Sequence, residues 1–198
     1  MCTISKVNGA VVLRIRRSAI SYRTASVHCA NKVVERIARH FEGRDGGMEK
    51  ETSVVYVTHQ HGCSELSYDA AQTEATIVGT GANPNVYGVL VVGLGCEVIQ
   101  ADHVAAEIKK RAPYKKVAHF TIQETGGTAK SVAKGIELVE GMLAEALTAE
   151  KSKGTLSDVV FGTECGGSDS FSGLSGNPAL GVASDVIIQQ GGSVILAE

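Results

Sequence analysis

The chain has 198 residues, 43% of them apolar, which is enough for one domain with its own hydrophobic core. Its 19 basic and 21 acidic side chains give a formal net charge of −2, so no strong field attracts nucleic acid or an anionic membrane. The longest apolar run, residues 86–96, is about half as long as a membrane-spanning helix requires. We therefore expect no nucleic-acid or membrane partner, which leaves a small neutral or anionic ligand.

The cysteines are odd in number and far apart, and no two of them form a CxxC pair. The five positions are Cys2, Cys29, Cys63, Cys96 and Cys165. This pattern argues against a disulfide scaffold and for a reducing compartment, so we expect a cytoplasmic protein.

The predicted elements begin with a segment that is hard to assign. Residues 11–15 can form a strand, residues 21–24 make a poor buried strand, and residues 31–41 have the apolar spacing of a helix. From residue 51 on, short β-branched runs alternate with segments of helical periodicity. Strands are expected at residues 54–57, 86–92, 117–122, 157–161 and 193–196. Helices are expected at residues 66–78, 102–111, 128–149 and 178–190.

Strands that are apolar on both faces and alternate with helices predict a parallel sheet that helices cover on both sides. The expected fold is a three-layer, doubly wound α/β domain, Rossmann-like, with a mainly parallel sheet of about 5–6 strands. We expect residues 29–198 to form this single domain, with residues 1–28 as a poorly assigned N-terminal segment.

The loops that follow the predicted strands carry most of the unusual residues. Ligands of open parallel sheets bind beyond the carboxyl ends of the strands, so these loops are the candidate site. Their sequences are THQHGCSE (58–65), GLGCE (93–97), QETGGT (123–128) and GTECGGSD (162–169). Cys29 lies at a comparable helix entrance. All of these loops are expected at the same edge of the sheet, where Cys, His and Glu side chains can bind Fe²⁺ or Zn²⁺.

Each motif also has a purely structural interpretation. A cysteine at a strand end is often a small buried hydrophobe, and His59 and His61 can be solvent-exposed loop residues. Gly126 and Gly127 precede a helix whose free N–H groups could hold a carboxylate or phosphate, or they form a tight turn with Thr128 near the helix cap. There is no GK[ST] loop and no GxGxxG fingerprint, so no nucleotide is expected.

Taken together, several blocks resemble a known family. The blocks HGC, NPNVYGVLVVGLGCE, TIQETGGTAK, GTECGGSDSFSGLSGNPALGVASD and GGSVILAE are similar in order and spacing to the altronate dehydratase and D-galactarate dehydratase family. This family includes the large subunit of sulfolactate sulfo-lyase. The resemblance implies a lyase that removes water, or sulfite, from a sugar acid or sulfo-acid to give a 2-keto acid. It also implies Fe²⁺ or another divalent metal as cofactor.

The resemblance also implies residue roles at the matching positions. The implied catalytic residues are His59, Glu97, Cys165 and Asp169. The implied substrate-binding residues are Gly126, Gly127, Thr128, Ser168 and Asn177. The implied metal ligands are His59, Cys63, Cys96 and Cys165. Gln123, Glu164, Gly166 and Gly167 match the family without an assigned role, and His61 stands where the family varies.

The chain departs from the family pattern in three respects. Asn83 replaces a histidine that is common before Pro-Asn, and Glu164 stands at a position that varies among subgroups. Members also continue beyond the last matched block and often begin with another small domain. We therefore expect this chain to be part of a larger enzyme, either a homo-oligomer or associated with a C-terminal domain or subunit. A carbon–sulfur lyase, a non-catalytic half-site that needs a partner chain, and an iron–sulfur or redox role stay open as alternatives.

Overall fold

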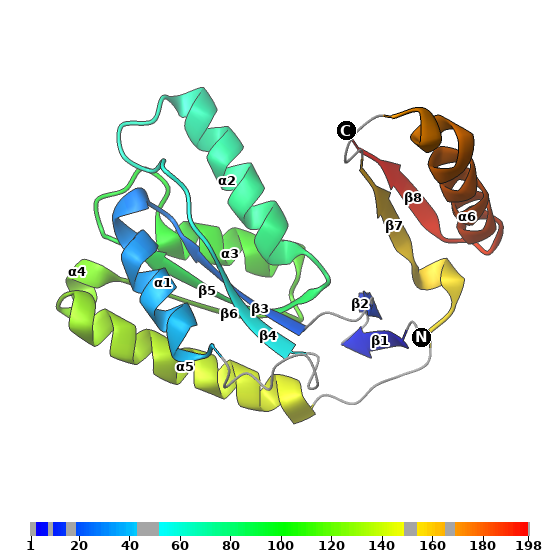
Figure 1. Cartoon of the computed structure of the whole chain (residues 1–198). Coiled ribbons are helices and arrows are strands. Elements are labelled where there is room, and N and C mark those ends of the chain that lie inside the picture. Colours follow the sequence, from blue (N-terminus) through cyan, green and yellow to red (C-terminus); the bar gives the residue numbers. More distant parts are fainter. Residues whose placement is uncertain are drawn as a thin grey trace. The chain divides into compact units, whose positions relative to one another are not determined.

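The computed structural model describes residues 3–7, 10–14, 19–42, 52–148, 154–164 and 169–197 (Figure 1). The chain divides into two compact units, of which the larger is Arg16–Ala149. The smaller unit combines Met1–Ile15 with Glu150–Glu198. The predicted division at residue 28 therefore differs from the structural one, because the strand before residue 28 belongs to the larger unit.

The larger unit is built on a four-stranded sheet in the order β4-β3-β5-β6. Its strands are β3 (Ala19–Ala25), β4 (Thr52–Val57), β5 (Val86–Gly93) and β6 (Lys116–Thr121). All three pairings are parallel. The carboxyl ends of these strands therefore lie at one edge of the sheet, as the alternation of strands and helices predicts.

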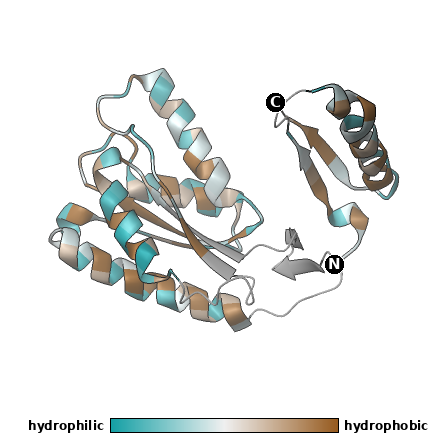
Figure 2. Ribbon diagram, in the orientation of Figure 1, coloured by the Kyte–Doolittle hydropathy of each residue, from teal (hydrophilic) through white to brown (hydrophobic). Residues whose placement is uncertain are grey.

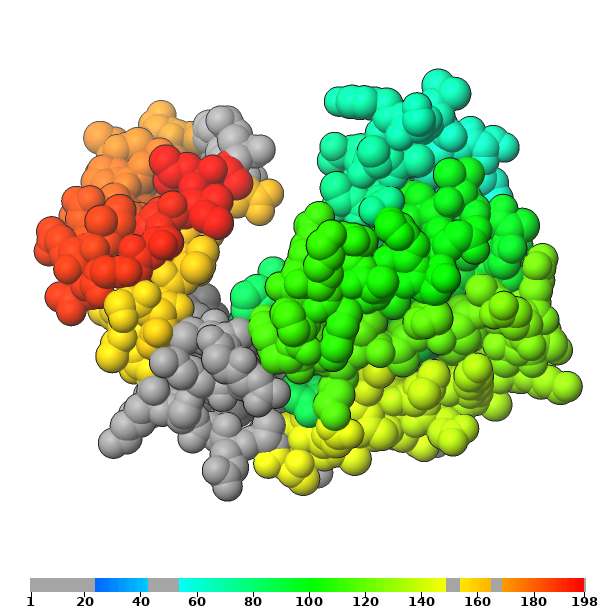
Figure 3. Space-filling model, turned by 180° about the vertical axis from the view of Figure 1, so that it is seen from behind, coloured from blue at the N-terminus to red at the C-terminus, as the bar shows by residue number. Residues whose placement is uncertain are grey.

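Helices cover both faces of this sheet. The side chains of β5 alternate between the two faces and pack against a different pair of helices on each. Leu90 and Val92 pack in one apolar core with α1 (Asn31–His40) and α5 (Thr128–Thr148). Val89 and Val91 pack in a second core with α2 (Ser67–Ala82) and α3 (Ala101–Arg111). Figure 2 shows β5 in the hydrophobic colour, and in Figure 3 the side chains of α2 and α3 close over one face of the unit. The predicted three-layer α/β fold is confirmed.

The poor strand expected at residues 21–24 lies inside the sheet. β3 pairs with β4 on one side and with β5 on the other, so both edges of its backbone are hydrogen-bonded. Thr24 and Ala25 are fully buried. Strand propensity depends on the neighbouring strands, and local sequence does not show that two partners flank this segment.

The smaller unit has its own parallel pair, β7 (Val160–Thr163) with β8 (Ser193–Leu196), joined through α6 (Asn177–Gln189). Two short helical turns, Leu156–Asp158 and Ser172–Gly176, precede β7 and α6. The unit also contains the antiparallel hairpin of β1 (Thr3–Val7) and β2 (Ala10–Arg14).

The main sheet thus has four strands, where the sequence predicts about 5–6. The pattern correctly predicts strands near β7 and β8, but a β-branched run does not specify its pairing partner, and these two strands pair with each other. No helix in the described ranges is both long and apolar enough to cross a membrane.

Candidate functional site

Three loops converge at the carboxyl edge of the four-stranded sheet. They follow β3, β4 and β5, and backbone hydrogen bonds join them directly. The N–H of His28 donates to the carbonyl oxygen of His61 (2.9 Å), and the N–H of Val98 donates to that of Gly62 (3.0 Å). The loop after β4 is therefore fixed on both sides by its neighbours.

Gly62 allows the closest approach between these loops. Its φ is +109°, and a Cβ atom at this position would lie 2.6 Å from the Cα of Val27 and 2.8 Å from the carbonyl oxygen of Ser26. A side chain would meet backbone there, which cannot move aside cheaply. The glycine of the HGC motif is thus required by packing between two loops.

Glu97 holds the loop after β5 in place. Its carboxylate accepts hydrogen bonds from the backbone N–H groups of Leu94 (3.1 Å) and Gly95 (2.6 Å) and from the hydroxyl of Ser26 (2.9 Å). The residue is only 3% exposed. The family resemblance predicts a catalytic role for Glu97, whereas both of its oxygens accept hydrogen bonds from donors of the protein itself.

His59 is also fully engaged. Its Nδ1 accepts the N–H of His61 (3.2 Å), which leaves the proton on Nε2, and Nε2 donates to the carbonyl oxygen of Ala25 (2.8 Å). The rings of His59 and His61 are stacked, with centroids 6.1 Å apart. A role for His59 as base or metal ligand would need one of these two hydrogen bonds to break.

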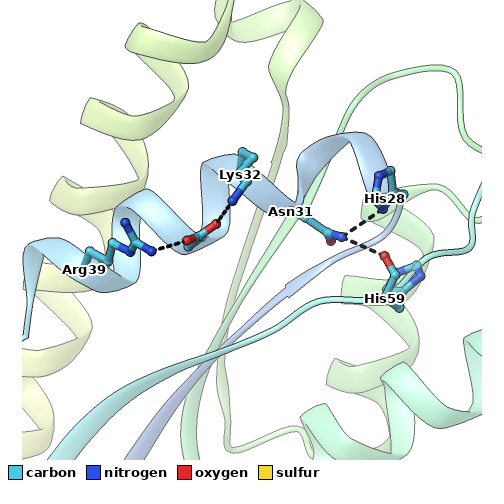
Figure 4. Close-up of polar contacts among 6 residues, drawn as sticks. His28, Asn31, Lys32, Arg39 and His59 are labelled. Atoms are coloured by element: carbon cyan, nitrogen blue, oxygen red, sulfur yellow. Dashed lines mark hydrogen bonds and ion pairs between the residues drawn. The ribbon is translucent and has the colours of Figure 1, made fainter.

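Asn31 links the first turn of α1 to the other loops (Figure 4). Its side-chain N–H₂ donates to the carbonyl oxygen of His59 (2.7 Å) and lies 3.3 Å from Nδ1 of His28. Further along α1, Glu35 pairs with Lys32 and Arg39, both at 2.6 Å. The Lys32 hydrogen bond lowers the pKa of the Glu35 carboxyl. These ion pairs stabilise the helix surface, whereas the Asn31 contacts shape the candidate site.

Three thiols lie near one another on these loops. Cys29 belongs to the turn His28–Ala30, Cys63 follows Gly62, and Cys96 stands between Gly95 and Glu97. All three are free and exposed. The pKa of the Cys63 thiol is raised by its partly desolvated surroundings, and then by the neighbouring Cys29, Cys96 and Glu97.

The loop after β6 approaches the same edge. The N–H of Gln123, in the short helix α4 (Ile122–Thr125), donates to the carbonyl oxygen of Leu94 (3.1 Å). The side-chain oxygen of Gln123 lies 2.6 Å from where a Cβ of Gly95 would be, and Gly95 has a φ of +123°. Four loops of the larger unit are therefore connected at one edge.

Gly126 and Gly127 form the turn between α4 and α5, with φ values of +88° and +102°. Their N–H groups donate to Gln123 (3.1 Å) and Ile122 (2.9 Å) and so close the end of α4. The backbone N–H groups that lack an intrahelical partner are those of the first turn of α5, which begins at the exposed Thr128. Lys130 folds back over this turn, with Nζ 3.5 Å from the position of a Gly126 Cβ. Its charge and the helix N-terminus together favour an anion here.

The predicted metal ligands do not assemble into a site for one ion in the described residues. No group of three or more His, Cys, Asp or Glu side chains within those ranges has the arrangement to hold a metal ion. The ring nitrogens of His59 are both hydrogen-bonded. Cys165, the fourth predicted ligand, lies outside the described residues.

The remaining predicted residues belong to the smaller unit. Asp169 caps the helical segment that follows it, since its Oδ1 accepts the N–H (2.7 Å) and hydroxyl (3.0 Å) of Ser172. These bonds lower the pKa of the Asp169 carboxyl. Glu164 and Asn177 are exposed. Gly166, Gly167 and Ser168 lie outside the described residues. The expectation that their loop lies at the same sheet edge assumed one shared sheet, whereas β7, which precedes this loop, pairs with β8 in a separate sheet.

Asn83, which replaces a common family histidine, lies before β5 at the opposite, amino edge of the sheet. Its carbonyl oxygen accepts from Lys115 Nζ (2.8 Å), and its Oδ1 accepts the N–H of Asn85 (2.9 Å). Asn83 therefore shapes a turn, and the substitution removes no side chain from the carboxyl edge.

A parallel sheet covered by helices on both faces, with connected polar loops at its carboxyl edge, defines a domain of the doubly wound α/β class. The family model for the second domain of D-galactarate dehydratase/altronate hydrolase matches residues 24–147, and the one for the C-terminal part of D-galactarate/altronate dehydratase matches residues 156–198. The chain therefore belongs to the D-galactarate/altronate dehydratase family. The first match lies within the larger structural unit and the second within the smaller one, whose first segment, Met1–Ile15, neither model matches.

Named relatives agree with this assignment. The chain is 32% identical over 173 residues to altronate dehydratases of Bacillus subtilis and Escherichia coli, covering 87% of the chain and 34% of each relative. It is 27% identical over 169 residues to the (2R)-sulfolactate sulfo-lyase subunit beta of Chromohalobacter salexigens, covering 85% of the chain and 40% of that protein. The chain thus spans about a third of the length of the altronate dehydratases.

Some residues of this edge are absent from the predicted site. Ser26 and Asn31 carry no local signal, because their role depends on partners far along the chain. Lys130 is part of the quoted TIQETGGTAK block, and its position three residues after the glycine pair could have drawn attention to it. Cys29, at the entrance of α1, is not among the predicted ligands.

Proposed function

We propose that this chain forms part of a hydro-lyase that dehydrates a sugar acid, such as altronate or galactarate, to a 2-keto acid. The observation that carries the proposal is the connection of four family-matched loops at one sheet edge, next to a lysine and a helix N-terminus. Such an edge can bind a carboxylate and present the adjacent carbon to groups on the neighbouring loops.

Dehydration of a sugar acid needs groups that stabilise negative charge and groups that transfer protons. Removing the proton next to a carboxylate gives a highly charged enediolate, which preorganised donors stabilise. Lys130 and the first turn of α5 would bind the substrate carboxylate, together with Thr128. A base takes the proton and an acid assists the leaving hydroxyl. The proton-transfer roles of His59, Glu97, Cys165 and Asp169 stay predictions, and substitution of His59 or Glu97 should also disturb the loops that they hold.

Iron is the proposed cofactor, and no nucleotide is proposed. Among the described residues, the thiols are the groups most available to bind it, since the nitrogens of His59 are occupied. A cytoplasmic location is proposed from the free cysteines. A multi-subunit or homo-oligomeric assembly is proposed because one relative is named as a subunit.

A second candidate is a sulfolactate sulfo-lyase reaction, which the likeness to the subunit beta supports. The two reactions share proton removal beside a carboxylate and differ in the leaving group, which is sulfite in place of hydroxide.

Product analysis distinguishes these reactions. The chain, prepared anaerobically with iron, is incubated in parallel with altronate, galactarate and sulfolactate, and both 2-keto acid and sulfite are measured. Keto acid from a sugar acid supports the hydro-lyase, whereas sulfite from sulfolactate supports the alternative. Turnover that arises only after a second subunit is added would support the half-site interpretation.

A further inference from the structure

A histidine and a buried carboxylate lie close together in the loop after β4. Nδ1 of His61 is 3.5 Å from Oε1 of Glu65, and the same oxygen accepts the hydroxyl of Thr73 in α2 (2.8 Å). The Glu65 side chain is only 6% exposed, whereas that of His61 is 61% exposed. The pair therefore consists of an anchored carboxylate and an accessible ring.

The second oxygen of the Glu65 carboxylate is unused. Oε2 is buried and has no hydrogen-bond partner within the described ranges. A buried oxygen without a partner is destabilising on its own. Here it keeps a free acceptor next to the His61 ring, which favours the tautomer with the proton on Nδ1. Nε2 of His61 is then left as a hydrogen-bond acceptor.

Nε2 of His61 is available to a ligand. The other hydrogen bonds of this residue are made by its backbone: the N–H donates to Nδ1 of His59 (3.2 Å), and the carbonyl oxygen accepts from His28 (2.9 Å). Nε2 makes no hydrogen bond to any residue that the structure describes. An exposed and oriented acceptor at the carboxyl edge of a parallel sheet is suited to bind a hydroxyl group.

His61 and Lys130 belong to opposite ends of this edge. The sheet order is β4-β3-β5-β6, so the segments that carry the two residues follow the two outermost strands. Three strand spacings of about 4.8 Å separate these strands. A three-carbon acid bound at Lys130 is too short to span this distance, whereas the chain of a six-carbon sugar acid extends much further across the edge.

We propose that His61, oriented by Glu65, binds a hydroxyl group of the sugar acid at the end away from its carboxylate, and so selects long polyhydroxy acids over three-carbon acids such as sulfolactate. The hydroxyl donates to Nε2 while Nδ1 faces Glu65. Glu65 is a positioning residue, because it acts through the His61 ring. The inference rests on the proposed function, since it places a sugar acid at this edge, but it is tested by binding in place of turnover.

The test compares two acids that differ at the far end. Altronate and glycerate, a three-carbon hydroxy acid, are titrated into the full 198-residue chain, and both dissociation constants are measured by NMR. His61→Ala removes the ring but keeps both backbone hydrogen bonds of the residue. We expect it to weaken altronate binding about ten-fold and to leave glycerate binding unchanged. Lys130→Ala should weaken the binding of both acids.

The matched control is His40→Ala, at the last residue of α1. Nε2 of His40 lies 3.6 Å from Oε1 of Glu140, so it forms a similar pair, but at the opposite end of the helix from the site. This variant should bind both acids as the wild type does.

Two variants of Glu65 test its positioning role. Glu65→Gln keeps an oxygen that can accept from Nδ1, so it should retain most of the altronate affinity that Glu65→Ala loses. The ring nitrogen chemical shifts of His61 report its tautomer and should move in Glu65→Ala. Thermal unfolding checks that each variant is folded.

Equal weakening of both acids by His61→Ala would overturn the proposal, as would altronate binding that this variant leaves unchanged. Absence of altronate binding by the wild type would overturn it too. If the wild type forms keto acid from altronate alongside either of the first two results, the dehydratase function stands without this inference. Selective loss of altronate binding in His61→Ala, without turnover by the wild type, would support the inference and count against that function for the isolated chain.

Discussion

The hydroxyl of Ser26 donates a 2.9 Å hydrogen bond to the carboxylate of Glu97, 71 residues further along the chain. The bond joins the loop after β3 to the loop after β5. Two backbone N–H groups of the second loop bind the same carboxylate. Glu97 thus links the loop after β3 to the loop after β5 and holds Gly95 and Cys96 in position.

Glu97→Gln is expected to destabilise the protein. The amide replaces one acceptor oxygen by a donor that faces other donors in a buried place, at a cost of about 1–3 kcal/mol. Glu137→Gln, at an exposed position of α5, is the matched control and should change stability by less than about 0.5 kcal/mol. Urea unfolding measures both, and equal effects would contradict the structural role of Glu97.

Gly62→Ala should be among the more damaging small substitutions. The new methyl group would lie 2.6 Å from the Cα of Val27, and the φ of +109° is unfavourable for alanine. We expect a loss of about 2 kcal/mol or more. Gly79→Ala, in α2, meets no atom within 4 Å, so it should stabilise the helix by up to about 1 kcal/mol. Thermal unfolding compares them, and a tolerated Gly62→Ala would show that the loops are not in close contact.

Lys115 makes stability depend on pH. It is 1% exposed, its Nζ donates to the carbonyl oxygens of Asn83 and Val86, and burial lowers its pKa from 10.5 to about 8. Between these pKa values the unfolded chain holds a proton that the folded chain has lost, so stability rises with pH. The stability of the wild type relative to Lys115→Met should therefore rise from about pH 8 to 10, by at most about 1.4 kcal/mol per pH unit. A difference that does not vary with pH would contradict this assignment.

Asp169 offers a test of capping against catalysis. Asp169→Ala removes the acceptor for the Ser172 N–H, so amide hydrogen exchange in the following helix should become faster. Asn is also a good N-cap residue, so Asp169→Asn should exchange nearly like the wild type. The lowered pKa of the carboxyl means that its stabilisation is present at neutral pH and is lost as the pH falls through that pKa. Fast exchange in both variants would contradict simple capping. Lost turnover in Asp169→Asn with unchanged exchange would support the predicted catalytic role.

Much of the fold follows from local pattern. The periodicity in residues 128–149 predicts α5 to within one residue, and Ser193–Leu196 forms the expected strand β8. The position of β3 could not be predicted in this way, because its burial results from pairing with two strands far away in the sequence. The pairing of β7 with β8, separate from the main sheet, likewise depends on contacts that a linear pattern does not contain.

The sequence predicts the location of the candidate site better than it predicts the roles of the individual residues. The rule that loops after parallel strands converge correctly brings the regions of His59, Cys96 and Gln123 to one edge. Their individual roles depend on which hydrogen bonds each side chain makes, and the bonds of His59 and Glu97 are to neighbouring backbone. Lys130 acquires its position from the turn at Gly126, which the sequence alone does not orient.

Carboxylate binding by Lys130 and the first turn of α5 is the central claim about this edge of the sheet. The direct measurement is calorimetric titration of altronate into the wild type, Lys130→Ala and Lys134→Ala, the last removing an exposed charge one turn further along α5. We expect the wild type to bind altronate and Lys134→Ala to bind it equally well. Lys130→Ala should bind altronate about ten-fold more weakly or worse, because a charge-assisted hydrogen bond is lost. No binding by the wild type, or equal binding by Lys130→Ala, would contradict the proposed carboxylate-binding role of Lys130.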